Sequence, residues 1–315
     1  MDKGTGLAER LDGEEIMTTP KPINLMIAGA QKAGTTSLLR YLGTHPDICV
    51  HEQIEMTYFA LDEEYQRGYR WAYEKYFCYS NDLPSFVFAK NVDIMNLPEA
   101  ARRLKEHNPD VHIVTLLRNP VERAYSAYWF ARSKGREKLK SFEEAIIAEP
   151  ERLKKDPYKW RHNAYLDKGN YCKHLEMLSN LFGKEKLHIF LDEDFKRDPL
   201  QVCNKIVNLF SLDPMKDISV VQKKHNTSAM ARSDVCARAI NRIVREPNAI
   251  KRFIKTHVPE NITQYMGTKV DKLNRRPFVY PAMKLETRRE LVGYFYEQSK
   301  QLSGFIDVDL NEWIK

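Results

Sequence analysis

One stretch near the amino terminus constrains the fold of this chain more than any other. Leu25 to Ala28 form a short apolar run suited to a buried strand, and Gly29 to Gly34 interrupt that pattern. Leu38, Leu39 and Leu42 then recur at helical spacing. The stretch therefore predicts a strand, a glycine-containing loop and a helix, an arrangement whose backbone amides favour a bound anion.

The residues of this loop indicate which kind of anion site it forms. The spacing of Gly29 and Gly34 matches the first half of a Walker A loop, but Thr35 stands where that motif needs its lysine. Lys32 lies inside the loop instead, and the hydroxyls of Thr36 and its neighbours follow. The alternative is an ordinary strand-to-helix turn, but a phosphate-like ligand accounts for more of these features.

The segment G-A-Q-K-A-G-T-T-S-L resembles the 5′-phosphosulfate loop of sulfotransferases that use 3′-phosphoadenosine 5′-phosphosulfate (PAPS). The resemblance implies that this loop binds the sulfonate-bearing end of PAPS. The residues that it implicates are Gly29, Gln31, Lys32, Ala33, Gly34, Thr35, Thr36 and Ser37.

Strand and helix patterns alternate along much of the chain. Strands are predicted at 48–50, 86–89, 111–117 and 187–191, and helices at 98–107, 121–130, 171–182, 199–210 and 284–302. Such alternation indicates an α/β protein, a three-layer P-loop-like fold with a central parallel sheet flanked by helices. The highly charged segment 132–161 is expected to form exposed loops around one helix at 142–148.

Length and composition predict a single large domain. The 315 residues are 43% hydrophobic, which is enough for one full core. We expect a flexible polar tail at 1–20 and one domain at 21–315. Within it, residues 213–283 form a helical and loop cap over the site, with short helices at 237–244 and 250–257.

Charge and cysteine usage exclude several classes of protein. The net charge of +7 suits anionic ligands, but the chain has no arginine-rich tract or aromatic RNA-binding signature, so we expect no nucleic-acid partner. Its five cysteines are scattered and lack metal-ligand spacing, which predicts neither a disulfide framework nor a metal site. Without an apolar run of spanning length we expect a cytoplasmic protein that does not enter a membrane. The sequence leaves the oligomeric state open.

A second motif, L-L-R-N-P-V-E-R-A-Y-S at 116–126, resembles the sulfotransferase element that binds the 3′-phosphate of PAPS. Arg118 and Ser126 occupy the matching positions. A guanidinium presents forked donors that suit phosphate oxygens. The alternative is a surface arginine paired with Glu122 at the start of a helix.

A general base is implied by the segment E-M-T-Y-F at 55–59, which resembles the E-x-x-F-F segment of glycan sulfotransferases related to the heparan sulfate enzymes. The resemblance assigns Glu55 as the catalytic base, since the acceptor must lose a proton as it attacks sulfur. His51 and Glu52 are local rivals, and an ordinary surface carboxylate is the other alternative. Lys90 resembles the lysine near the transferring group in the same enzymes, or is a strand-end lysine that extends to solvent.

Later residues complete the implied PAPS site. Tyr171 is a candidate for the adenine pocket, although core packing explains it equally well. The basic run at 272–277 resembles the late loop that folds over the nucleotide, which makes Asn274, Arg275 and Arg276 candidates.

These matches lead to one functional hypothesis and three alternatives. We expect sulfonate transfer from PAPS, without a metal, to a hydroxyl or an amine or amide nitrogen of a small-molecule natural product. A glycan acceptor is the main alternative. A P-loop kinase or NTPase, for which Leu187 to Glu193 resembles a Walker B strand, and a non-catalytic nucleotide-binding protein are the others. Acidic residues favour a cationic acceptor such as an alkaloid; they are Glu137, Glu143, Glu144, Glu149 and Asp156.

Overall fold

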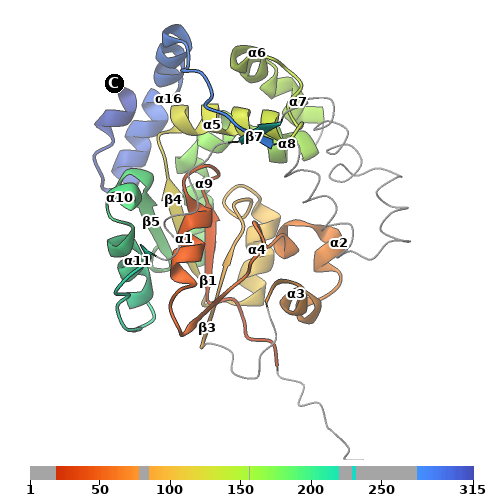
Figure 1. Ribbon diagram of the computed structural model, residues 1–315, viewed down its shortest axis with the longest axis vertical. Coiled ribbons are helices and arrows are strands. Elements are labelled where there is room, and N and C mark those ends of the chain that lie inside the picture. Colours follow the sequence, from red (N-terminus) through yellow and green to blue (C-terminus); the bar gives the residue numbers. More distant parts are fainter. Residues whose placement is uncertain (1–18, 78–84, 156, 220–228, 232–274) are drawn as a thin grey trace, which may run out of the picture.

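The computed structural model describes residues 19–77, 85–155, 157–219, 229–231 and 275–315 (Figure 1). Nearly all of the predicted tail at 1–20 lies outside these ranges. Most of the predicted cap at 213–283 does too, including both of its helices at 237–244 and 250–257. Both regions therefore remain predictions.

The centre of the fold is a five-stranded sheet with the strand order β2-β3-β1-β4-β5. Its strands are β1 (Leu25–Gly29), β2 (Ile48–Val50), β3 (Phe86–Lys90), β4 (His112–Leu117) and β5 (Leu187–Leu191). Every pairing is parallel. β1 is central and buried along its whole length, as its continuous apolar run predicts for a parallel sheet.

Helices cover both faces of this sheet. α1 (Thr35–Leu42) follows β1 towards β2, whereas α4 (Pro98–His107) follows β3 towards β4, in the opposite direction along the sheet. Right-handed crossovers therefore place these two helices on opposite faces. α1 packs against α11 (Pro199–Asn208), and α4 packs against α9 (Tyr171–Phe182). The predicted α/β fold is confirmed.

Further helices and a two-stranded ribbon surround these layers (Figure 1). The further α-helices are α2 (Asp62–Tyr65), α3 (Tyr69–Tyr76), α5 (Pro120–Ser133), α6 (Phe142–Ile147), α7 (Glu149–Lys155), α8 (Pro157–Asn163), α10 (Asp192–Arg197) and α16 (Leu285–Ile306). The 3₁₀ turns are η1 (Tyr58–Ala60), η2 (Asp167–Gly169), η3 (Lys184–Lys186) and η5 (Asn311–Ile314). An antiparallel ribbon joins β6 (Ala229–Ala231) to β7 (Arg275–Pro277) and lies against α5.

A second hydrophobic cluster fixes α5, the helix that leaves the end of β4. Tyr125 and Tyr128 of α5 pack with Phe142 of α6 and Phe295 of α16. The start of α5 is capped by Asn119, whose side chain accepts hydrogen bonds from the amides of Val121 and Glu122. Packing at one end and capping at the other set the position of Arg118 and Ser126 relative to the sheet.

The charged segment 132–161 is more ordered than its composition predicts. The expected loops contain α7 and most of α8, and the side chains of Glu137 and Glu149 are buried. Glu137 pairs with Arg152 at 2.6 Å. Glu149 accepts hydrogen bonds from the backbone amides of residues 165–167. The expectation of exposed loops was wrong because Arg152 neutralises Glu137 and backbone amides satisfy Glu149 inside the protein.

This buried network yields a prediction about stability. Glu137→Gln should lower the free energy of unfolding by about 3 kcal/mol, because it leaves Arg152 without the carboxylate that neutralises it. Urea denaturation measures the loss. Glu151→Gln is the matched control, since Glu151 pairs with Lys154 in an exposed contact at 3.3 Å and its loss should be too small to resolve. Equal losses for the two variants would contradict this account.

Candidate active site

The predicted site residues meet at the carboxyl edge of the sheet, where parallel α/β proteins bind ligands. β1 ends in the glycine loop, β3 ends in Lys90 and β4 is followed by Arg118. β1 lies between the other two strands, with Ile27 opposite Lys90 and Gly29 opposite Thr115. The convergence expected from the sequence is therefore present.

The glycine loop takes a conformation that few side chains tolerate. Lys32 and Gly34 both have left-handed backbones, with φ of 74° and 91°. A side chain at Gly34 would also place its Cβ 3.3 Å from the Phe195 ring. The amide of Ala30 donates to the carbonyl of Leu116 at 2.8 Å, which fixes the loop to β4. The N-cap of α1 is Gly34, which has no side chain to cap the first turn, an arrangement that suits an external anion.

The residues at the start of α1 differ in exposure. Gly34 is exposed, whereas Thr35 is 4% exposed. Gln31, Thr36 and Ser37 are half-buried, and Ala33 is buried. A ligand at this loop would therefore meet backbone groups and the partly open side chains of Gln31, Thr36 and Ser37.

Lys32 lies among other cations. Its ammonium is 4.6 Å from the centre of the Phe130 ring. Burial, together with the charges of Arg118 and Lys90, lowers the pKa of Lys32 to about 8. A polyanion would relieve this repulsion, so the electrostatics of the loop fit the phosphosulfate end of PAPS.

Arg118 is positioned but not saturated by its neighbours. Its Nη1 donates to the carbonyl of Lys32 at 3.2 Å. Its guanidinium lies 3.7 Å from Asp192 and 3.9 Å from Glu122, beyond direct hydrogen bonding. The alternative surface pair with Glu122 is thus only a long contact. Ser126 lies on α5, the helix that begins two residues after Arg118, and its side chain is 6% exposed.

Tyr171 supports the position of Arg118 from below the surface. The tyrosine is 1% exposed, and its hydroxyl donates to the carbonyl of Arg118 at 2.8 Å. Its ring packs near Trp313, with the ring centres 6.2 Å apart. These contacts are those of a core residue beside the predicted phosphate site, and contact with adenine remains a prediction.

Glu55 is held by donors at both carboxylate oxygens. Lys90 Nζ donates to Oε1 at 2.5 Å, and the amide of Val92 donates to Oε2 at 3.1 Å. Burial raises the pKa of Glu55, while the charge of Lys90 lowers it. The carboxylate is oriented and keeps 25% of its side chain exposed, which suits a proton acceptor. Lys90 is 1% exposed, so it is not a lysine that extends to solvent.

The rival bases have different surroundings. Nδ1 of His51 lies 2.8 Å from the carbonyl of Gln53, and Nε2 accepts the amide of Lys90 at 3.0 Å. Both ring nitrogens are therefore engaged within the protein. Burial lowers the pKa of His51 to about 4. Glu52 is exposed, and these contacts favour Glu55 over either rival.

The late basic residues are only partly described. Asn274 lies outside the described residues. Arg275 and Arg276 form part of β7, where they pair with Ala231 and Met230 of β6. β6, the strand with which they pair, lies against α5, the helix that carries Ser126.

Some contacts of this site have little or no signal in the sequence. The hydrogen bond from Val92 to Glu55 comes from the backbone amide, so the type of side chain at position 92 does not predict it. Asp192 follows β5 directly, so the strand-end rule could have found it as a neighbour of Arg118. Trp313 donates its indole N–H to Glu193 at 3.1 Å, a contact that no local pattern predicts.

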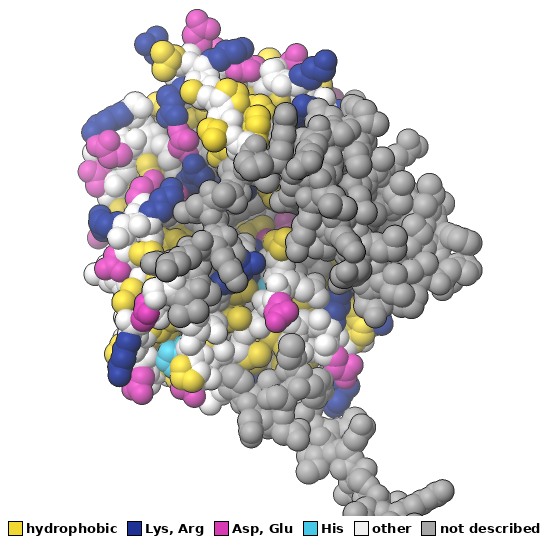
Figure 2. Space-filling view, viewed as in Figure 1, with side chains coloured by type: hydrophobic (Ala, Val, Ile, Leu, Met, Phe, Trp, Pro, Cys, Tyr) yellow, Lys and Arg dark blue, Asp and Glu magenta, His cyan; other side chains and the backbone are white. Residues whose placement is uncertain are grey.

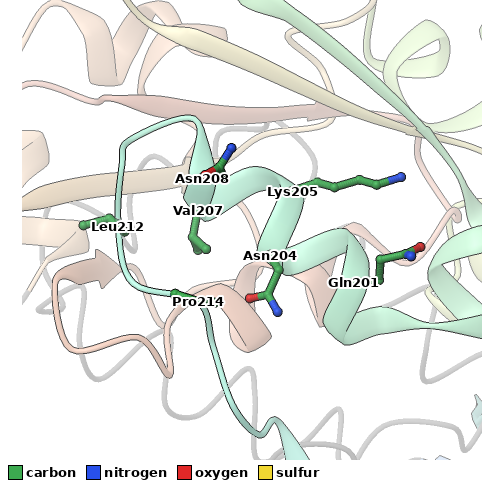
Figure 3. A pocket seen from close by; sticks show the side chains of 7 residues that line it. All are labelled: Gln201, Asn204, Lys205, Val207, Asn208, Leu212 and Pro214. Carbon is green, nitrogen blue, oxygen red and sulfur yellow. The ribbon is translucent and has the colours of Figure 1, made fainter.

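A hollow of about 310 Å³ lies elsewhere, on α11 and the turn that follows it. Figure 3 shows Gln201, Asn204 and Lys205 along the helix, with Leu212 and Pro214 on the turn. None of the described residues that line it is a predicted site residue. We assign it no role in the chemistry.

The surface seen in Figure 2 mixes acidic and basic side chains over the region of α10, α11 and α16. That part of the surface therefore has no broad basic patch. Within the described ranges, no helix is long and apolar enough to cross a membrane. The same part of the chain contains no group of three or more His, Cys, Asp or Glu residues arranged to hold a metal ion.

Comparison with known proteins decides the family. Residues 22–240 match the family model described as the sulfotransferase domain. The chain belongs to the sulfotransferase domain family. It is an enzyme of that class, and the family implies PAPS as the sulfonate donor.

Relatives and a solved structure agree with this assignment. The bifunctional heparan sulfate N-deacetylase/N-sulfotransferase 1 of Mus musculus is 30% identical over 290 residues, which cover 90% of this chain and 29% of the relative. The corresponding enzyme of Drosophila melanogaster is 29% identical over 215 residues, covering 62% and 20%. The sulfotransferase therefore spans less than a third of these relatives. A crystal structure of a sulfotransferase from Alicyclobacillus acidocaldarius has the same fold, with a TM-score of 0.63, 24% identity, and coverage of 94% of this chain and 100% of that one.

The low pKa of Lys32 predicts that nucleotide binding depends on pH. Lys32 loses its proton above about pH 8 in the free protein, whereas a bound anion favours the charged form. The affinity for 3′,5′-adenosine bisphosphate should therefore fall as the pH rises from 7 to 9.5. Isothermal titration calorimetry measures it, and Lys32→Met should weaken binding at pH 7 and remove most of this dependence.

Arg118→Ala serves as the control, because a guanidinium keeps its charge over this range. This variant should weaken binding on the order of tenfold to hundredfold at pH 7, since it removes charge-assisted hydrogen bonds. Its affinity should still fall with rising pH, but at a higher pH than in the wild type, because the charge of Arg118 no longer lowers the pKa of Lys32. Arg102→Ala removes an arginine whose charge pairs with Glu99 and Glu106 on the exposed face of α4, and it should bind normally. A wild-type affinity that does not change between pH 7 and 9.5 would refute the role of Lys32.

Proposed function

We propose that this sulfotransferase transfers the sulfonate of PAPS to a hydroxyl or an amine or amide nitrogen, with Glu55 as the general base. The observation that carries the proposal is the position of Glu55, held by Lys90 and the amide of Val92 at the strand edge that also bears the glycine loop. This arrangement supports the proposal, because a carboxylate and a glycine loop lie at one edge of the sheet.

The residues at this edge divide the work of the reaction. Bound PAPS supplies an electrophilic sulfonate group. Glu55 accepts the proton of the acceptor, and its fixed orientation limits where that acceptor can lie. Lys32 and the amides of the glycine loop stabilise the negative charge that develops on the leaving phosphate. Arg118 and Ser126 bind the 3′-phosphate, which fixes the position of PAPS relative to the glycine loop and Glu55.

The acceptor proposed here is a small-molecule natural product. Its charge is a separate question, because three of the five acidic residues that suggested a cationic acceptor have partners within the protein. Glu137 and Glu149 are buried in the network described above, and Glu143 accepts a hydrogen bond from Thr287 at 2.8 Å. Glu144 is exposed, and Asp156 lies outside the described residues. The proposal of a cationic acceptor therefore rests on Glu144 and Asp156.

A glycan acceptor is the second candidate. It is favoured by the similarity to the heparan sulfate N-deacetylase/N-sulfotransferases, which extends over 90% of this chain in one relative. Incubation with PAPS and either a metabolite extract or N-deacetylated heparosan distinguishes the two, with mass spectrometry detecting products that gain one sulfonate. Products from the extract alone support the small-molecule proposal, and products from the polysaccharide alone contradict it.

Glu55→Gln tests the base directly. The variant should bind 3′,5′-adenosine bisphosphate normally and lose turnover on the order of 10²- to 10⁴-fold, because an amide cannot accept the acceptor's proton. Radiolabelled sulfonate transfer measures turnover, and calorimetry measures binding. The wild type should lose activity as the pH falls through the pKa of Glu55, which burial raises above its ordinary value.

Two further variants separate Glu55 from its neighbours. Glu52→Gln should retain turnover because the Glu52 side chain is exposed and makes no contact with Lys90 among the described interactions. His51→Asn should lose stability along with activity, since His51 bonds the backbone of β3. Near-normal turnover in Glu55→Gln would refute the assignment.

A further inference from the structure

A buried carboxylate in the turn after β3 has no part in the reaction proposed above. Asp93 is 4% exposed, and its Oδ2 lies 2.6 Å from Arg161 Nε. Its Oδ1 lies 3.3 Å from Lys168 Nζ. Arg161 belongs to α8 and Lys168 to η2. One carboxylate thus joins three segments that are far apart in the sequence.

The same turn also holds the segment that carries Glu55. Val92 donates its amide to Glu55, and the side chain of Asn91 donates to the carbonyl of Met56 at 2.8 Å. The Asn91 side chain in turn accepts the amide of Asp93 at 2.9 Å. A shift of Asp93 would therefore move the groups that orient the proposed base.

On its other side, the carboxylate reaches the nucleotide-binding half of the site. η2 leads directly into α9, where the hydroxyl of Tyr171 donates to the carbonyl of Arg118. Lys168 also donates to the carbonyl of Arg161 at 3.0 Å, so η2 and α8 are bonded to each other as well as to Asp93. These contacts, together with the backbone between Lys168 and Tyr171, connect Glu55 to Arg118.

We propose that Asp93 is a positioning residue that fixes the turn after β3, which holds the segment carrying the base, against α8 and η2. It acts through Arg161 and Lys168 and does not touch the reacting atoms. The proposal rests on the proposed function, because it takes Glu55 to be the base. It goes further because it states that one ion cluster, made of Asp93, Arg161 and Lys168, sets the position of the base relative to the nucleotide site.

The charges of this cluster also act on the base. Among the described residues, Lys90 and Asp93 are charged groups that act on Glu55, the first lowering and the second raising its pKa. Burial raises the pKa of Asp93, but Arg161, Lys168 and His162 outweigh it and bring the pKa to about 2. Asp93 is therefore charged at neutral pH and adds negative potential at Glu55.

Two variants test the proposal through opposite electrostatic effects. Asp93→Asn removes the negative charge and leaves two cations uncompensated, so it should lower the pKa of Glu55. Arg161→Gln leaves Asp93 less neutralised, so it should raise that pKa. Each shift should be on the order of half a pH unit. If the two variants only disturbed the packing, they would not shift the pKa of Glu55 in opposite directions.

The titration is followed by carbon NMR of protein labelled at the glutamate carboxyl carbon, with 3′,5′-adenosine bisphosphate bound. The spectrum of Glu55→Gln identifies the Glu55 signal. Sulfonate transfer provides the second readout: Asp93→Asn should lower turnover on the order of tenfold to hundredfold because the base is misplaced. Its affinity for the bisphosphate should change less than about threefold.

Asp62→Asn is the matched control. Asp62 pairs with Arg103 at the same distance of 2.6 Å but belongs to α2. It should leave the Glu55 titration and turnover unchanged. If Asp93→Asn fails to fold, Arg161→Gln still decides the matter, since the Arg161 side chain is 18% exposed and its replacement leaves the contact between Asp93 and Lys168.

The outcomes separate this inference from the proposed function. Titrations of Glu55 that do not move, or that move in the same direction in both variants, would overturn the role of Asp93 while leaving Glu55 as the base. Turnover that survives Glu55→Gln would overturn the base itself, and the inference with it.

Discussion

A buried lysine at the end of β3 determines the arrangement of the whole site. Lys90 is 1% exposed, and a buried ammonium without a counterion is strongly unfavourable. Glu55 provides the counterion at 2.5 Å. The backbone of Lys90 also bonds His51 through its amide and Met56 through its carbonyl. The loop that carries the proposed base is thus attached to the sheet by one residue.

Charge at the carboxyl edge explains why this site suits an anion. Burial lowers the pKa of Lys32, and repulsion from Arg118 and Lys90 lowers it further. The acids near Arg118 lie too far from it to form direct hydrogen bonds. The fold therefore tolerates an unfavourable concentration of positive charge that a phosphorylated donor would relieve, a common compromise between stability and function.

The sequence predicted the fold and the strand-end residues because both follow from short-range patterns. Apolar runs mark the strands, and the parallel-sheet rule places Lys90, Arg118 and the glycine loop together. Other features depend on which groups meet in space. The engagement of both His51 nitrogens, the amide of Val92 and the internal pairing of Glu137 have no local signature. Charge density alone therefore misassigned the segment 132–161 as exposed.

The proposed base depends on a balance that no single neighbour could provide. Burial alone would favour the protonated form of Glu55, which cannot accept a proton. Lys90 counters this by stabilising the carboxylate, but a close ammonium also weakens its basicity. Asp93 opposes Lys90 from the far side of the turn, with Arg161 and Lys168 limiting its effect. A carboxylate that must be ionised and still basic therefore requires both signs of charge, which explains why an acidic residue belongs in this cationic edge of the sheet.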